Sequence, residues 1–198
     1  MARATLSRSL VLLSVLAVAG CDKIKESLPW GRYSVASTSM EPTLKKGTFV
    51  SGQSVAAADL RRGDILFVRR TRDSEDVYVL RLVGLPGDRI GFVNGAIVLN
   101  GKRVVQRPIG RWRIEDSYLP QDAVMLTERF PGERHAHRVL DDLLSPGDNF
   151  PETKLGPDDY FLVGDNRDHA ADSRYDEQLS YGVGIVNGAD IVRRLVPE

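Results

Sequence analysis

The chain has 198 residues, enough for one domain with a buried core. Lysine plus arginine number 27, as do aspartate plus glutamate, and this zero formal charge argues against a nucleic-acid partner, which usually requires a basic excess. The composition, 42% hydrophobic and 27% charged, is that of a globular protein. The single cysteine, Cys21, excludes an intramolecular disulfide, a cysteine-based zinc site and a CxxC redox motif.

The N-terminal segment has the pattern of an export signal. Arg3 and Arg8 precede an apolar run over residues 10–20 that ends at Cys21. As a helix, this run reaches about 16 Å, against roughly 30 Å for the hydrocarbon core of a bilayer, so it is too short to span a membrane. The pattern therefore predicts a signal peptide over residues 1–20.

Cys21 directly follows small residues, because residues 18–20 are Val-Ala-Gly. This arrangement resembles a bacterial lipobox, in which the cysteine is diacylated and the chain is cut before it. The resemblance implies lipid attachment at Cys21, with residues 21–32 as a lipid-anchored tether. Asp22 implies retention at the periplasmic face of the inner membrane, as in enteric bacteria, although other lineages do not follow that rule. The alternatives are an ordinary cleaved signal peptide with an unrelated cysteine, or a short anchor.

Beyond the tether, β-strand signals dominate the chain. Short runs rich in β-branched and aromatic residues predict strands at residues 48–50, 65–68, 77–83, 160–163 and 189–196. The clearest stretch is 88–105, where Asn-Gly pairs at 94–95 and 100–101 separate apolar runs. Asn-Gly supplies the two positive φ angles that a tight hairpin turn requires, so a three-stranded meander is predicted.

Residues 106–150 show no clear period. They carry scattered charge and Pro-Gly turns at 131–132 and 146–147, so we predict an irregular segment with His135 and His137 on its surface. The sequence contains neither a long amphipathic helix pattern nor an internal repeat. The predicted fold class is therefore mainly β.

Three segments carry the chemical signal. Residues 37–44 are Ser-Thr-Ser-Met-Glu-Pro-Thr-Leu, residues 78–88 are Tyr-Val-Leu-Arg-Leu-Val-Gly-Leu-Pro-Gly-Asp, and residues 164–174 are Gly-Asp-Asn-Arg-Asp-His-Ala-Ala-Asp-Ser-Arg. Together, and in this order, they resemble bacterial signal peptidase I, a membrane-bound serine protease that removes signal peptides from exported proteins. The resemblance covers about residues 33–198.

The resemblance assigns roles to residues in two of these segments. It implies that Ser39 is the nucleophile and that Ser37 donates to the oxyanion hole beside the backbone N–H of Ser39. Such donors stabilise the negative oxygen of a tetrahedral intermediate. It implies no metal and no cofactor. It also implies that paired side chains hold the wall of the active site, namely Asp165, Arg167, Asp172 and Arg174.

The sequence departs from this family at two positions that act together. A serine hydroxyl is a weak nucleophile until a base accepts its proton, and signal peptidase I uses a desolvated lysine. That lysine position is Leu80 here, and neither leucine nor the following Arg81 can accept a proton. The family's serine that orients the lysine is replaced by Ala170, and the preceding residue is His169.

Three explanations follow from these departures. The enzyme is inactive and its fold is reused for binding; or His169 replaces the lysine as base, oriented by Asp168 or Asp172; or a nearby lysine, Lys45 or Lys46, reaches Ser39. Histidine is the usual base for a serine nucleophile. On an extended segment, however, the side chain of residue 169 points away from that of residue 170.

The resemblance also implies a division of the chain and its partners. We predict a signal-peptidase-type antiparallel β core from residues 33–90 and 150–198, with a smaller β-rich insertion at 91–149. The substrates would be exported preproteins bound as an extended strand, with small residues such as Ala before the cut bond. The alternative function is a catalytically inactive lipoprotein homologue that binds signal peptides or a complete partner peptidase.

Overall fold

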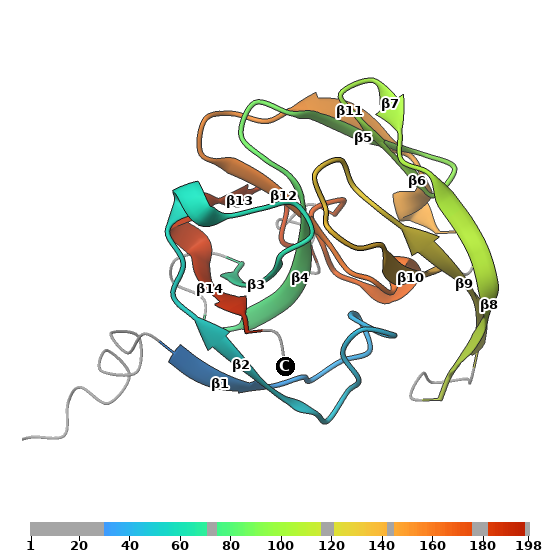
Figure 1. The fold of residues 1–198 in the computed structure, drawn as a ribbon, viewed down its shortest axis with the longest axis horizontal. Coiled ribbons are helices and arrows are strands. Elements are labelled where there is room, and N and C mark those ends of the chain that lie inside the picture. The colour runs from blue at the N-terminus through green and yellow to red at the C-terminus, as the bar shows by residue number, and fades with distance from the viewer. Residues whose placement is uncertain (1–29, 71–74, 116–120, 142–144, 176–181, 197–198) are drawn as a thin grey trace, which may run out of the picture.

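The computed structural model describes residues 30–70, 75–115, 121–141, 145–175 and 182–196. The signal region and Cys21 lie outside these residues, and of the tether only residues 30–32 lie within them. The elements that form are β-strands and single-turn 3₁₀ helices, which confirms the mainly β fold class (Figure 1). In the part of the chain that the structure describes, no helix is long and apolar enough to cross a membrane.

A seven-stranded antiparallel sheet forms the larger part of the molecule. Its order is β1 (Trp30–Ser34), β2 (Phe49–Gln53), β14 (Ile191–Leu195), β3 (Ile65–Arg69), β4 (Val77–Gly84), β12 (Asp159–Val163) and β13 (Val186–Asn187). Figure 1 shows β4 and β12 in the middle of the molecule, between the other strands of this sheet and the remaining sheets. All five strands predicted outside the meander are thus found, within a few residues at each end.

The predicted meander forms part of a four-stranded sheet in the order β11 (Phe150–Lys154), β5 (Arg89–Val93), β6 (Ala96–Leu99) and β7 (Lys102–Arg103). Its turns are as the Asn-Gly pairs predict. Asn94 and Asn100 have φ of 47° and 51°, and the following glycines have φ of 73° and 74°. Strand β11 pairs with β5 across the border between the predicted core and insertion, and that domain division stays a prediction.

A three-stranded sheet occupies residues 106–141. The prediction of an irregular segment was therefore wrong, although the resemblance had implied β structure in this region. The sheet consists of β8 (Gln106–Ile114), β9 (Gln121–Glu128) and β10 (His137–Asp141), in the order β10, β9, β8. Most of β8 is exposed on both faces, and its register shifts between Pro108 and Gly110. Because of this exposure, β8 lacks the alternation of polar and apolar residues by which half-buried strands are predicted.

Two apolar clusters meet at β12 and position the loop that follows it. Phe161 and Val163 pack in the cluster beneath the four-stranded sheet, whereas Tyr160 and Leu162 pack in the cluster of the large sheet. This alternation follows from the pleat of a strand that is buried on both faces. Strand β12 ends at Val163, so residue 164 and the charge-rich motif after it leave directly from the centre of the core.

Candidate active site

The loop of residues 35–48, between β1 and β2, carries Ser37 and Ser39. The Ser37 hydroxyl donates to Ser39 Oγ at 3.0 Å and accepts the backbone N–H of Ser39 at 3.4 Å. The Asn166 backbone N–H donates to the Ser39 carbonyl at 3.0 Å, and Asn166 Nδ2 donates to the Thr38 carbonyl at 3.1 Å. These bonds hold the serine loop against the motif at residues 164–174, so two segments far apart in sequence form one site.

Arg81 and Asp165 form a buried ion pair beneath this loop. Arg81 donates Nε at 2.7 Å and Nη2 at 2.6 Å to the two carboxylate oxygens of Asp165, and Nη1 at 2.7 Å to the Gly63 carbonyl. Thr43, in the serine loop, donates its hydroxyl to the same carboxylate at 2.5 Å. Burial alone raises the pKa of Asp165, but Arg81 and Thr43 outweigh it and hold the pKa below its ordinary value.

Asp172 and Arg174 stabilise the other side of the same motif. Asp172 accepts the Gly164 backbone N–H at 3.1 Å and two bonds from Arg174, from Nε at 3.0 Å and Nη2 at 2.9 Å. Arg174 also donates to the Arg167 carbonyl. The structure brings all four residues of the predicted wall together as buried, ion-paired side chains, Asp165, Arg167, Asp172 and Arg174.

Glu128 and His137 belong to this network, although the sequence did not indicate them. Glu128 accepts Nη2 of Arg167 at 2.5 Å and lies opposite His137 in the β9–β10 register, with His137 Nε2 3.3 Å away. His137 Nδ1 lies 2.8 Å from Glu133 Oε1. The side chain of His137 is only 7% exposed, so its prediction as a surface residue was wrong, whereas His135 is exposed.

These neighbours shift two pKa values. Burial alone would raise the pKa of Glu128, but Arg167 and His137 outweigh it and lower the pKa to about 2. Burial lowers the pKa of His137, and the neighbouring carboxylates of Glu128 and Glu133 outweigh it, so the pKa of His137 lies above its ordinary value. The pair therefore carries opposite charges between about pH 2 and 6.5. Among the described residues, no group of three or more His, Cys, Asp or Glu side chains is placed to hold a metal ion.

Leu80, which the sequence predicts at the position of the family's lysine, is 1% exposed. It belongs to the apolar cluster of the large sheet, with Leu66 opposite it on β3 and Leu82 on the same face of β4. The next residue, Arg81, points to the other face, where it is committed to Asp165. Position 80 is therefore an aliphatic core position, and its side chain supplies no proton acceptor.

Ala170 lies against the serine loop. A Cβ built on Gly164 would lie 2.2 Å from the Ala170 Cβ and 2.7 Å from the Ser39 carbonyl oxygen, so all three residues meet at one point. Only glycine fits at residue 164, because any side chain would collide with both neighbours. Ala170, which the sequence predicts in place of the family's orienting serine, therefore lies beside Ser39 and presents a methyl group.

The three alternative bases, His169, Lys45 and Lys46, all lie among the described residues, and both lysines are exposed. His169 ends the 3₁₀ helix η3 (Arg167–His169), is half-buried, and donates its backbone N–H to the Asn166 carbonyl at 3.1 Å. Ala170 after it is extended, so the two side chains leave the backbone in different directions. The Lys45 ammonium lies 5.6 Å from the centroid of the Trp112 ring on β8, which draws it towards the three-stranded sheet.

Comparisons with known proteins show which family the chain belongs to. The family model described as "Signal peptidase, peptidase S26" matches residues 6–196. Signal peptidase I P of Bacillus subtilis subsp. natto is 35% identical over 162 residues, which cover 81% of this chain and 71% of that protein. Signal peptidase I of Bacillus caldolyticus is 33% identical over 149 residues, covering 74% of this chain and 70% of that protein.

A solved structure is less similar to this chain than these relatives are in sequence. The crystal structure of a signal peptidase I from Enterococcus faecalis V583 matches 72% of this chain and all of that chain, with a TM-score of 0.40 and 21% identity. The family model spans nearly the whole sequence, and both Bacillus relatives cover more than two thirds of it. The chain therefore belongs to the signal peptidase I family of serine peptidases, peptidase S26.

Proposed function

We propose that this family member binds the signal-peptide region of exported preproteins and does not hydrolyse it through a Ser–Lys dyad. The observation that carries the proposal is the burial of Leu80 among aliphatic side chains at the lysine position. Without a base, the Ser39 hydroxyl keeps its proton and remains a poor nucleophile. The loss of the orienting serine at Ala170 supports the same conclusion, because a lysine and its positioning partner are needed together.

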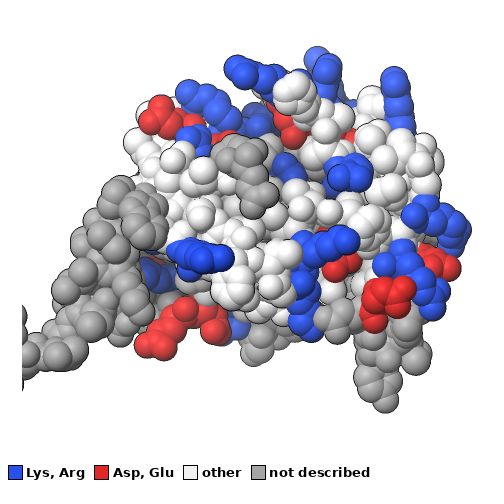
Figure 2. Space-filling view, turned by 60° about the horizontal axis from the view of Figure 1, so that its bottom comes forward, with Lys and Arg blue, Asp and Glu red and all other residues white. Residues whose placement is uncertain are grey.

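The residues around Ser39 support binding of a signal peptide without its cleavage. Hydrogen bonds from Asn166 to Ser39 and from Thr43 to Asp165 fix the serine loop. The face that comes forward in Figure 2, on the side of β1 and β2, has a largely uncharged surface between scattered Lys and Arg side chains, with Asp and Glu side chains at its edge. An extended peptide with small residues such as Ala suits a surface of this kind, because backbone hydrogen bonds provide affinity and shallow pockets provide specificity.

Members of this family are typically membrane proteins with a periplasmic catalytic domain. For this chain we propose a lipid anchor at Cys21, on the periplasmic face of the inner membrane, supported by the Val-Ala-Gly-Cys sequence at 18–21. On that membrane surface we propose a complete signal peptidase as the binding partner. Cys21→Ser should remove the acyl mass and release the protein from washed membranes. An unchanged mass and unchanged membrane association would contradict lipid attachment.

A second candidate function is an endopeptidase in which His169 is the base. The observation that favours it is the position of Ala170, the next residue, beside the Ser39 carbonyl. With a histidine base, cleavage of an Ala-x-Ala preprotein should disappear in Ser39→Ala and fall at least a hundredfold in His169→Ala. Lys45→Ala and Lys46→Ala should leave it unchanged. Cleavage that survives His169→Ala would exclude this function.

The test of the first proposal measures binding and cleavage separately. The protein should bind a labelled peptide containing Ala-x-Ala with a saturable Kd that is the same in Ser39→Ala, and no cleavage product should accumulate. Leu80→Lys with Ala170→Ser should then introduce cleavage, whereas Leu80→Met with Ala170→Ser, its matched control, should not. A peptide that fails to bind would overturn the proposal, as would cleavage by the unmodified protein.

A further inference from the structure

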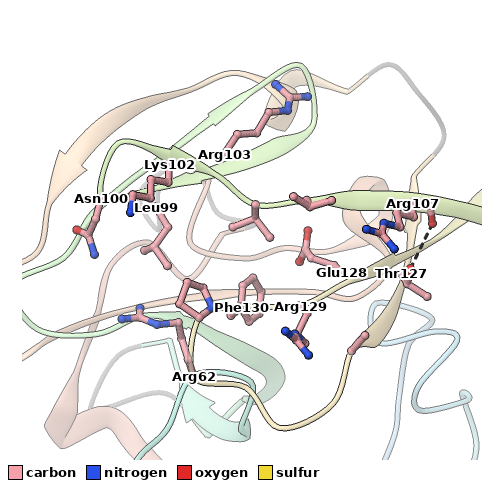
Figure 3. Close-up of a pocket in the computed structure, with 14 residues that line it drawn as sticks. Arg62, Leu99, Asn100, Lys102, Arg103, Arg107, Thr127, Glu128, Arg129 and Phe130 are labelled. Carbon is pink, nitrogen blue, oxygen red and sulfur yellow. Dashed lines mark hydrogen bonds between the residues drawn. The ribbon is translucent and has the colours of Figure 1, made fainter.

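A cavity of about 870 Å³ lies apart from the serine loop, between the four-stranded and three-stranded sheets (Figure 3). Its lining comes from the β6–β7 hairpin, from the start of β8, and from the end of β9 with the residues that follow it. The lining contains none of Ser37, Ser39, Leu80 or Ala170. Its volume is within the usual range of small-molecule sites, roughly 300–1,000 Å³.

One side of the cavity is apolar. Phe130, Leu99 and Val104 line it, and each also packs in the core beneath the four-stranded sheet. The Phe130 ring is held from behind by the His137 ring, with centroids 4.9 Å apart. Val105 extends the same wall and is 65% exposed. The wall is therefore rigid where it joins the core and leaves an apolar side chain open to solvent at its edge.

Cations surround this apolar wall. Figure 3 shows Arg62 and Lys102 on one side of Phe130, and Arg107 and Arg129 on the other. Arg62 is paired with Asp88 at 2.5 Å. Among the described residues, no carboxylate pairs with the four remaining cations of the lining, which are Lys102, Arg103, Arg107 and Arg129.

The one acidic residue of the lining does not cancel this charge. Glu128 is fully buried and is neutralised by Arg167 and His137 from behind the cavity. The cavity thus keeps an excess of positive charge in a chain whose formal net charge is zero. Cations gathered beside a low-dielectric apolar wall attract anions more strongly than the same cations spread over an open surface.

We infer that this cavity binds an amphiphilic organic anion. Its phosphate or carboxylate head group pairs with the rim cations, and its apolar part lies on Val105 and Pro131, the exposed edge of the apolar wall. Inorganic phosphate alone would leave the exposed apolar edge of the cavity, including Val105, in contact with water. A neutral amphiphile would leave the cations unpaired. The inference does not depend on preprotein binding, since the two sites share no residue.

The test is titration calorimetry on the purified full chain with four probes, each below its micelle concentration. Octyl phosphate should bind one to one. Inorganic phosphate and octyl glucoside should bind at least tenfold more weakly, since each has only half of the required chemistry. Octanoate should fall between octyl phosphate and these two. Equal affinity for octyl glucoside, or for inorganic phosphate, would overturn the inference.

Two variants locate the binding. Arg107→Gln and Arg129→Gln should each weaken octyl phosphate about tenfold, because each removes a charge-assisted hydrogen bond. Arg111→Gln is the matched control, since Arg111 is exposed on the same strand as Arg107 but outside the lining, and it should leave the affinity unchanged. An equal loss in Arg111→Gln would indicate general electrostatic attraction and contradict the inference.

A competition experiment identifies the source of the anion. Vesicles of phosphatidylglycerol that displace octyl phosphate, where phosphatidylcholine vesicles do not, would support the inference with an anionic lipid as the source. Retention of octyl phosphate in the presence of both vesicles would support it with a soluble amphiphile as the source. Displacement by both kinds of vesicle would show that the head-group charge is irrelevant, and would contradict it.

Discussion

At the scale of single residues, the proposed absence of Ser–Lys chemistry depends on position 80. A lysine there would have to be neutral at working pH, and burial among apolar side chains is what lowers the pKa of an amine. In this chain the apolar surroundings are present around Leu80, but the amine is absent. The same surroundings that would activate a lysine instead make Leu80 a part of the core, so its replacement has a cost in stability.

We expect Leu80→Ala to lower the free energy of unfolding by about 2–5 kcal/mol, because it removes a fully buried side chain and leaves a cavity. Leu80→Met keeps most of the volume and should cost less than about 1.5 kcal/mol. Urea unfolding followed by circular dichroism measures both. Equal stabilities of Leu80→Ala and the unmodified protein would show that position 80 is not packed as described.

The buried pair of Arg81 and Asp165 gives a second prediction at this scale. Asp165→Asn leaves the guanidinium without its buried counter-charge and should cost about 3–5 kcal/mol of unfolding free energy. Arg81→Met with Asp165→Leu removes both charges together and should recover most of that loss. A double variant no more stable than Asp165→Asn would contradict the view that the unpaired charge causes the loss.

The buried wall of Asp165, Arg167, Asp172 and Arg174 was predictable from the residues, whereas Glu128 and His137, which support it, were not. Ser37, Ser39, Leu80 and Ala170 fall inside local motifs, so their resemblance to the family could be read from spacing alone. Glu128 was not predictable in this way, because its partners come from other strands. Gln106 on β8 and His137 on β10 both lie opposite it in register. Such neighbours become visible only when the pairing of three strands is known.

At the scale of elements, β8 connects the three-stranded sheet to the serine loop. Trp112 on β8 donates its indole N–H to Glu41 in that loop at 3.0 Å. The Lys45 ammonium lies over the same ring. The sheet that sequence patterning missed is therefore one of the supports of the candidate site. It was missed because β8 is exposed and shifted in register, so its positions follow no burial period.

We expect Trp112→Phe to loosen the serine loop, because phenylalanine keeps most of the ring but cannot donate to Glu41. The loss of one hydrogen bond to a charged acceptor should cost about 1.5 kcal/mol. Hydrogen exchange of the backbone amides of residues 41–44 should become faster, while exchange in β12 stays the same. Unchanged exchange in the loop would show that β8 does not support it.

At the scale of the whole molecule, the charge network around Glu128 makes stability depend on pH. The folded-state pKa of Glu128 is about 2, below its ordinary value of 4.5, so its contribution is complete above pH 4.5 and is lost as pH falls towards 2. The pKa of His137 is raised above 6.5, so its contribution is complete below pH 6.5 and is lost as pH rises through the raised pKa.

Together these two groups stabilise the fold most between about pH 4.5 and 6.5. Thermal unfolding across the range from pH 3 to 9 measures this dependence. In His137→Gln the decline on the alkaline side should become smaller, whereas His135→Gln, an exposed control, should keep the full decline. Identical pH profiles for the unmodified protein and His137→Gln would contradict the assignment.

The central claim concerns Ser39, and one measurement tests it most directly. The purified protein is incubated with an Ala-x-Ala preprotein, and the amount of product cut at that site is compared with that formed by Ser39→Ala. Because Leu80 supplies no base, the two proteins should give the same background, although both bind the preprotein. Product that the unmodified protein forms and Ser39→Ala does not would show an activated serine and contradict the account.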